Sequence, residues 1–150
     1  MWGGFTVVEL VVVLLIMGIA AAVAAPKFYR SLQYHQLESA GRRVKLDLEQ
    51  LQHTARLKSS GQSMTFTGAA YTLSTDVDGL DHSDADYTVN LAEAPFEVDG
   101  VTINFGGLTT IAFNGYGEPS TGGTIVLTKG AGQQTITVSQ ESKLITITSE

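Results

Sequence analysis

The densest group of chemically active side chains in this 150-residue sequence is an acidic stretch, DVDGLDHSDAD, at residues 76–86. Carboxylate oxygens are the ligands that Ca²⁺ prefers, and Asp76, Asp78 and Asp81 have a spacing that could supply part of such a site. The stretch does not match an EF-hand, because its glycine comes too early and no glutamate follows at the required position. A solvated acidic loop is therefore the favoured interpretation, and these three aspartates are the candidate metal ligands.

No other group of residues has the spacing of a catalytic site. The histidines His35, His53 and His82 suggest neither shared metal ligation nor a catalytic triad, and the chain has no cysteine. No serine lies in a nucleophile-elbow pattern. The stretch GYGEPSTGG at 115–123 lacks the lysine of a phosphate-binding loop and leads into no helix, so we expect a flexible hairpin connection there. The sequence therefore predicts a protein that is not an enzyme and uses no cofactor.

One acidic residue, Glu9, stands near the start of an otherwise apolar run. Leu10 to Ala25 contains no charged residue, and with the preceding apolar residues the run has about the length of a transmembrane helix. A secretory signal peptide is the alternative, but no basic residue precedes the run. An ionisable group at membrane depth is costly and points to a function with a charged partner. A positive charge on a neighbouring copy of such a helix would serve as that partner.

The sequence GFTVVEL and the apolar run after it resemble the class III signal of type IV pilins and type II secretion pseudopilins. The resemblance implies that a prepilin peptidase cuts after Gly4 and methylates the new N-terminal residue, Phe5. It also implies that Glu9 pairs with the N-terminus of an adjacent subunit during filament assembly, and that the helix bends at Pro26. Leaders in this family usually carry Lys or Arg before the glycine, whereas Met1-Trp2-Gly3-Gly4 has neither.

The positive residues follow the apolar run instead of preceding it. Lys27 and Arg30 come directly after its end, and on the positive-inside rule alone they would favour the opposite orientation in the membrane. We give the signal motif more weight than this charge count.

The helical pattern continues well beyond the membrane segment. Apolar or small residues recur at alternating steps of four and three and make a single stripe, whereas charged residues lie off that stripe. Ser59-Ser60-Gly61 supplies the stop signal. The stripe consists of Leu37, Gly41, Val44, Leu48, Leu51 and Ala55, and the residues off it are Arg42, Arg43, Lys45, Asp47, Glu49 and Gln52.

Charge is divided unevenly between the two ends of the chain. Residues 27–58 hold seven of the nine basic residues, whereas residues 59–150 hold eleven acids and two bases. A domain so acidic is a poor partner for nucleic acid, because phosphate contacts need clustered Lys and Arg. The basic residues Arg42, Arg43 and Lys45 could form a lipid or nucleic-acid patch, but we favour a solvated helix face with interleaved acids.

Beyond residue 62 the hydrophobic period changes from helical to two. Runs rich in Val, Ile, Thr and aromatic residues alternate with Gly, Asp, Asn and Ser, as antiparallel sheets require. The last three runs form a meander. The predicted strands are 63–67, 69–74, 87–91, 101–105, 109–113, 123–128, 134–139 and 143–148.

The C-terminal end supports a narrower resemblance. Phe113, the glycine-rich loop, GTIVL, TITVS and KLITI follow one another as in the GspH/FimT group of minor pilins and pseudopilins. The resemblance implies an α+β, type IV pilin-like fold, with a long N-terminal helix packed on a small antiparallel β domain. Glu141-Ser142-Lys143 stands where the family often has a Gly-Arg pair, which weakens any transfer of DNA binding. The expected segments are a leader (1–4), a transmembrane and filament-core helix (5–26), its amphipathic continuation (27–58) and a β domain (59–150).

Together these features predict a minor pseudopilin or pilin subunit in a type II secretion pseudopilus or type IV pilus. Its expected location is the bacterial inner membrane, crossed once, with the C-terminal domain periplasmic. The resemblance implies four partners: prepilin peptidase, other pilins, the inner-membrane assembly platform and membrane lipid. Two alternatives stay open, a DNA-uptake minor pilin and a membrane-anchored surface β domain with no role in a filament.

Overall fold

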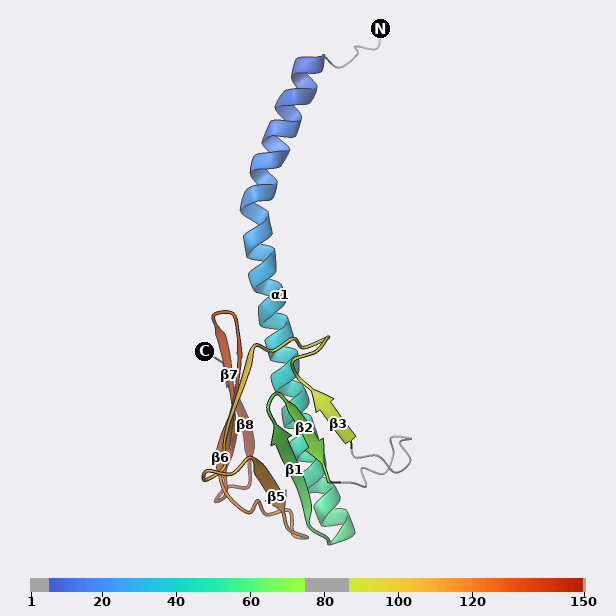
Figure 1. The fold of residues 1–150 in the computed structure, drawn as a ribbon, viewed down its shortest axis with the longest axis vertical. Helices are drawn as coiled ribbons and strands as arrows, with labels where there is room; N and C mark the ends of the chain where they lie inside the picture. Colours follow the sequence, from blue (N-terminus) through green and yellow to red (C-terminus); the bar gives the residue numbers. More distant parts are fainter. Residues whose placement is uncertain (1–5, 75–86, 150) are drawn as a thin grey trace. The chain divides into compact units, whose positions relative to one another are not determined.

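The computed structural model describes residues 6–74 and 87–149, which form one long helix and eight strands (Figure 1). This is the predicted α+β class. The chain forms two compact units, and the boundary between them falls between Gln33 and Tyr34. The elements are α1 (Val7–Lys58), β1 (Gln62–Thr67), β2 (Ala70–Leu73), β3 (Tyr87–Asn90), β4 (Gly100–Asn104), β5 (Thr110–Phe113), β6 (Gly123–Lys129), β7 (Gly132–Val138) and β8 (Ile145–Ser149).

The first unit contains the apolar half of α1. The helix runs without interruption through residue 26, and the bend expected at Pro26 stays a prediction. All side chains from Val7 to Ala25 are exposed. An 18-residue window here reaches a mean hydropathy of 2.8, so this helix is long and apolar enough to cross a membrane.

The helix ends at Lys58, as predicted, and the backbone at its end explains why. The N–H of Ser60 donates to the carbonyl of Ala55 at 3.2 Å, and the N–H of Ser59 donates to the carbonyl of Arg56 at 3.3 Å. Ser59 has a φ of +49°, the left-handed conformation that completes this two-bond Schellman cap. Serine here takes the position that glycine usually occupies.

The second unit holds two four-stranded antiparallel sheets. Sheet A has the order β3-β2-β1-β5 and sheet B the order β4-β6-β7-β8. All eight predicted strands are present, with ends displaced by no more than two residues. The predicted meander β6-β7-β8 is confirmed, with Ile125 opposite Ile136 and Ile136 opposite Ile147.

One hydrophobic core joins the second half of α1 to both sheets. The predicted stripe faces inward, since Leu37, Val44, Leu48, Leu51 and Ala55 are all buried. The residues that sheet A contributes to this core include Met64, Tyr71, Ile111 and Phe113, and those from sheet B include Ile125, Leu127, Ile136 and Val138.

Gly41 lies where α1 packs closely against β7 of sheet B. A Cβ added to Gly41 would stand 1.8 Å from Oε1 of Gln134 on β7, so a larger residue would displace that side chain. Gln134 is buried, and its Oε1 has no hydrogen-bond partner among the residues that the structure describes. The predicted stripe therefore includes one position that is required to be small, because a polar side chain of the facing strand fills the space.

The glycine-rich loop was expected to be a flexible hairpin connection, and that prediction is wrong. The loop leaves β5 in sheet A and enters β6 in sheet B, so it crosses between sheets. Its start is held by hydrogen bonds to Asn114, whose Oδ1 accepts from the N–H groups of Tyr116 and Glu118, both at 3.0 Å. The alternation of apolar and polar residues along the sequence shows where strands lie, but it does not show which sheet each strand joins.

Candidate functional site

The N-terminal end of α1 is capped by Thr6. Its Oγ1 accepts a hydrogen bond from the N–H of Glu9 at 3.3 Å, and its carbonyl accepts the first helical bond, from Leu10, at 3.2 Å. Thr6 and Glu9 have the T-x-x-E spacing of a capping box. Thr6 is a residue of this site that was not predicted, although its T-x-x-E spacing with Glu9 is visible in the sequence. The cap fixes where the helix starts and therefore places Glu9 in its first turn.

Glu9 is exposed and lies at the positive end of the helix dipole, where an acidic residue is favourable. In the part of the chain that the structure describes, no basic group lies within ion-pairing distance of it. A carboxylate among apolar side chains is costly to bury without a partner. The geometry of Glu9 therefore leaves it available to a cation from outside the described chain.

Around and beyond Glu9 the helix presents apolar side chains on every side. Val11, Leu14, Leu15 and Met17 are each more than half exposed, and they point in different directions around the axis. A helix that is hydrophobic all round is stable only inside lipid or between other apolar helices. This surface is suited to a membrane or to packing between helices.

The basic helix face is neutralised by its own acids, as the sequence analysis favoured. Nη2 of Arg42 lies 2.6 Å from Glu38, and Nζ of Lys45 lies 3.5 Å from Glu49. Both pairs have the i,i+4 spacing that brings side chains together on a helix. The face is a set of local ion pairs and not a continuous basic patch.

Asp47 was placed on the solvent side of the helix by the sequence analysis, and this prediction is wrong. Only 4% of Asp47 is exposed, and its Oδ2 accepts hydrogen bonds from Tyr71 Oη at 2.5 Å and from Arg43 Nε at 3.2 Å. Burial raises the pKa of Asp47, although the bond from Tyr71 and the charge of Arg43 oppose the shift. Burial and the neighbouring carboxylate also raise the pKa of Tyr71. These contacts tie α1 to sheet A.

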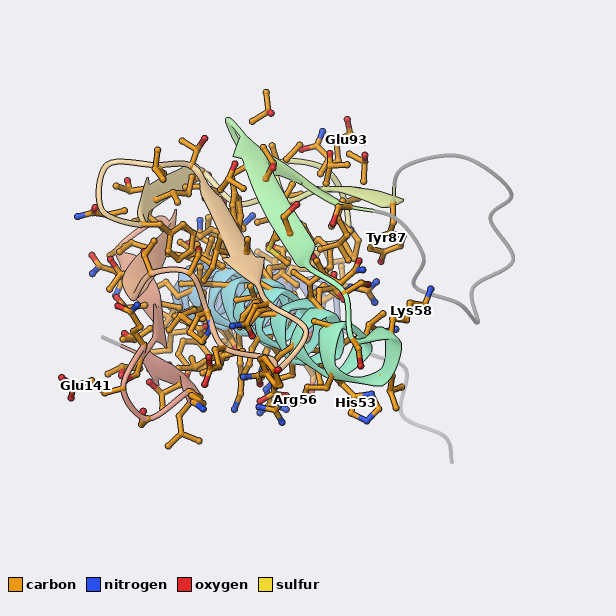
Figure 2. All side chains as sticks on the ribbon, turned by 90° about the horizontal axis from the view of Figure 1, so that it is seen from below. His53, Arg56, Lys58, Tyr87, Glu93 and Glu141 are labelled. Atoms are coloured by element: carbon orange, nitrogen blue, oxygen red, sulfur yellow. The ribbon has the colours of Figure 1, made fainter. Side chains whose placement is uncertain are left out.

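Arg43 extends this network to β3. Its guanidinium lies 5.6 Å from the ring centre of Tyr87, a cation–π distance. Tyr87 is the first described residue after the acidic stretch (Figure 2). One arginine therefore touches both the buried carboxylate on its own helix and an edge strand of sheet A.

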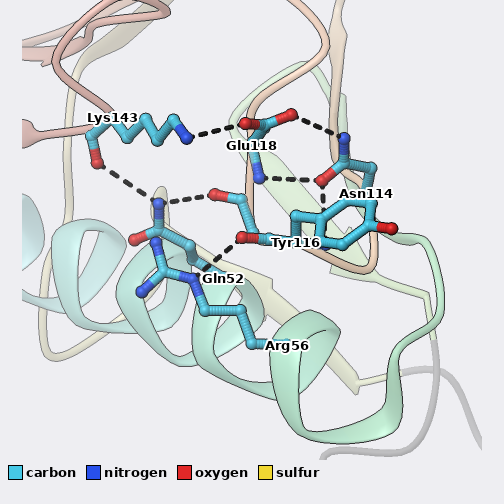
Figure 3. A network of polar contacts seen from close by, with 7 residues as sticks. Gln52, Arg56, Asn114, Tyr116, Glu118 and Lys143 are labelled. Carbon is cyan, nitrogen blue, oxygen red and sulfur yellow. Dashed lines mark hydrogen bonds and ion pairs between the residues drawn. The ribbon is translucent and has the colours of Figure 1, made fainter.

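The distal end of α1 is bonded to two loops by a polar network (Figure 3). Gln52 Nε2 donates to the carbonyls of Gly117 at 2.8 Å and Lys143 at 3.2 Å. Arg56 Nε donates to the carbonyl of Tyr116 at 3.2 Å. Side chains of α1 thus donate hydrogen bonds to backbone carbonyls in the loop between β5 and β6 and in the turn between β7 and β8.

Lys143 stands in the turn between β7 and β8, where the resemblance would have placed DNA-binding arginines. Its Nζ lies 2.6 Å from Oε1 of Glu118, and the other carboxylate oxygen, Oε2, accepts a hydrogen bond from Nδ2 of Asn114 at 3.1 Å. The bond from Lys143, followed by that from Asn114, lowers the pKa of Glu118. The cation is paired and is not offered to an external phosphate.

Two open hollows flank the glycine-rich loop. One, of about 610 Å³, is lined by residues that include Glu118, Ser120, Gln140 and Lys143, and the other, of about 560 Å³, lies beside Arg56 and Tyr116. None of the residues that line them is a histidine. His53 projects from the end of the helix into solvent (Figure 2). The first hollow contains the Ser120 hydroxyl and the Glu118 carboxylate, and Glu118 is bonded to Lys143 and Asn114.

Several predicted site residues lie outside the described part of the chain. Gly4 and Phe5 precede it, and Asp76, Asp78 and Asp81 fall in its internal gap. Within 6–74 and 87–149, no three His, Asp or Glu residues are grouped so that they could hold a metal ion. The cleavage, methylation and calcium predictions therefore stay predictions.

Comparisons with known proteins agree with this geometry. The family described as type II transport protein GspH matches residues 24–142 of this chain. No curated protein sequence matches it significantly. Among solved structures, the type IV minor pilin FimU of Pseudomonas aeruginosa shares the fold, at 16% identity and a TM-score of 0.57 over 77% of this chain and 90% of FimU. A second crystal form of FimU gives a TM-score of 0.53 at 16% identity, covering 75% and 92% of the two chains.

Proposed function

Because this chain belongs to the type II transport protein GspH family, we propose that it works by assembling into a pseudopilus or pilus as a minor subunit. The observation that carries the proposal is the helix from Val7 to Ala25, apolar and exposed on every side, with Glu9 unneutralised at its start. Such a surface has no use in an isolated soluble domain. It fits a subunit that is first held in a membrane and then packed among other helices.

Processing would prepare the helix for this step. We propose that prepilin peptidase cuts between Gly4 and Phe5 and methylates the new amino group. Thr6 supports this cleavage point, because it caps the helix one residue after the new N-terminus. The resulting positive charge would stand four residues before Glu9 in the sequence of each subunit.

Glu9 would then set the register between neighbouring subunits. Its carboxylate pairs with the amino group of an adjacent helix as both leave the bilayer. Apolar packing supplies most of the cohesion, and an unpaired carboxylate in the dry bundle penalises every other register.

The segments follow from this mechanism. Residues 1–4 act as the leader, 5–26 as the membrane and filament-core helix, 27–58 as its continuation, and 59–150 as the β domain. The subunit crosses the inner membrane once with the β domain on the periplasmic side, where it meets the assembly platform and other pilins.

The test compares Glu9→Gln with Glu38→Gln in cells that contain the assembly machinery. Glu9→Gln keeps the size of the side chain and removes its charge, whereas Glu38 already pairs with Arg42 in its own chain. We expect Glu9→Gln to stay in the membrane fraction but to vanish from sheared filaments and from cross-links to other subunits. Normal incorporation of Glu9→Gln would refute the proposal. Mass spectrometry of the native N-terminal peptide, expected to begin at methylated Phe5, tests the processing step separately.

The DNA-uptake alternative is the less favoured one. The basic groups it would use are paired, Lys143 with Glu118 and Arg42 with Glu38. A mobility-shift assay with the full chain in detergent should show no DNA binding at physiological salt, and binding that disappears in Lys143→Gln would revive this alternative.

A further inference from the structure

Two cations on α1, Lys27 and Arg30, have no acid to neutralise them. No Asp or Glu occurs between Glu9 and Glu38, and in the described part of the chain neither cation makes an ion pair. The basic residues farther along the helix behave differently, since each of Arg42, Arg43 and Lys45 pairs with an acid four residues away. Lys27 and Arg30 are therefore exposed cations without an acidic partner among the residues that the structure describes.

Their spacing places both charges on one side of the helix. Residues three apart are neighbours on a helix surface, and like charges at that spacing destabilise each other. An anion that contacts both ammonium and guanidinium groups would remove this repulsion. Phosphate oxygens are suited to the role, because Arg and Lys donate several charge-assisted hydrogen bonds to them.

Apolar and aromatic side chains cover the remaining sides of the same segment. Phe28 is 74% exposed, Tyr29 62% and Leu32 46%. Successive residues are turned by about 100° around a helix, so Phe28 and Tyr29 point away from the side that carries the two cations. Aromatic rings with basic neighbours, directly after an apolar run, are typical of the boundary between hydrocarbon and headgroups.

We propose that Lys27, Phe28, Tyr29, Arg30 and Leu32 form an interfacial collar that binds the phosphate groups of membrane lipids. Lys27 and Arg30 contact the phosphates of anionic headgroups, while Phe28, Tyr29 and Leu32 lie at the level where acyl chains meet those headgroups. The collar fixes how deep the apolar run sits in the bilayer. The inference rests on the membrane anchoring in the proposed function and adds its lipid ligand.

The collar also accounts for the position of the charges after the apolar run. As topology signals, Lys27 and Arg30 would oppose a periplasmic β domain. As lipid ligands they act locally, because long basic side chains near the end of a membrane helix extend toward the headgroups.

The test measures lipid selectivity at the protein surface. The full chain is reconstituted in phosphatidylcholine vesicles that contain either spin-labelled phosphatidylglycerol or spin-labelled phosphatidylcholine, and electron paramagnetic resonance gives the motionally restricted fraction of each lipid. A basic residue near an anionic surface corresponds to up to about fivefold in association. We expect a several-fold preference for phosphatidylglycerol that falls to about onefold in Lys27→Gln/Arg30→Gln and weakens at high salt.

A matched control uses the same helix and the same change in charge. Arg42→Gln/Lys45→Gln removes two cations that pair with Glu38 and Glu49, and it should keep the preference of the wild type. Equal selectivity in the Lys27→Gln/Arg30→Gln variant and the wild type would overturn the collar. So would loss of selectivity in the control variant, since it would make net charge and not position the cause.

Extraction of the same vesicles with alkaline carbonate separates the two proposals. A chain that resists extraction but shows no lipid preference overturns the collar alone. A chain that is extracted does not span the bilayer, which overturns the membrane anchoring and the collar with it. Cross-linking of residue 30 to an acidic protein neighbour in the membrane, in place of lipid contact, also counts against the collar.

Discussion

The two halves of α1 share one backbone geometry and differ in what covers them. Up to Gln33 the helix has almost no buried side chain, whereas beyond Tyr34 every third or fourth residue is covered by a sheet. Leu14 and Leu48 show the contrast, since Leu14 is 59% exposed and Leu48 is fully buried. The same residue type in the same helix is thus exposed in one half and packed against the chain's own sheets in the other.

This difference in burial shows where each half of α1 obtains its stability. The first half is apolar all round, and its hydrophobic free energy is available only to lipid or to other helices. The second half carries one apolar stripe and a charged face, so it folds against its own sheets and leaves ion pairs in water. The proposed assembly requires both, because the helix would leave the membrane for a bundle while the domain stays folded.

The largest effect should come from truncating a leucine in each half. Leu48→Ala removes fully buried methyl groups and leaves a cavity, so it should lower the free energy of unfolding of the domain by about 2–5 kcal/mol. Leu14→Ala should change it by less than about 0.5 kcal/mol. Denaturation of the full chain in detergent, followed by near-UV circular dichroism, measures both. A comparable loss from Leu14→Ala would mean that the first half is covered by its own chain.

The next effect comes from the bond that ties α1 to sheet A. Tyr71→Phe leaves the buried carboxylate of Asp47 without its shortest donor, and hydrogen bonds to charged groups contribute about 1.5–3 kcal/mol. We expect a loss of that size in the same denaturation experiment. Tyr116→Phe serves as the control, because the Tyr116 ring is exposed and its change should have almost no effect.

A pH-dependent effect should follow from Asp47 itself. Its pKa in the folded state is raised above 3.8, mainly by burial, so the protonated form of the carboxyl makes the more favourable contribution to the stability of the folded state. This contribution is present below the unfolded-state pKa and is lost as pH rises through the raised folded-state pKa. Asp47→Asn should therefore gain stability relative to the wild type as pH rises across that window. A difference that does not change with pH would contradict this assignment.

The smallest effect should come from the solvated face of α1. Arg42→Ala removes an exposed i,i+4 pair with Glu38 and should cost about 0.3–0.5 kcal/mol, less at high salt. Thermal unfolding at low and high ionic strength tests this value. A loss above about 1 kcal/mol would show that this face contacts more than water and Glu38.

The sequence by itself determined the elements of this protein. Apolar length marked the membrane-type half of α1, period 3.6 marked the inward stripe from Leu37 to Ala55, and period two marked all eight strands. Each of these signals is local, because it depends on residues within a few turns or within one strand. Glu9 was noticed for the same reason, as one charge inside an apolar run, and Thr6 was within reach of the same local rule.

Only the tertiary structure decided which residues meet across elements. Asp47 is polar by type and was placed facing solvent, but Tyr71, 24 residues later in the chain, gives it a buried partner. Gly41 is small because Gln134 of a distant strand lies against it. The loop after Phe113 changes sheets because strand pairing, and not strand pattern, assigns β5 and β6. Periodicity determines which side of an element faces inward, whereas the identity of its partner depends on how the chain closes over long separations.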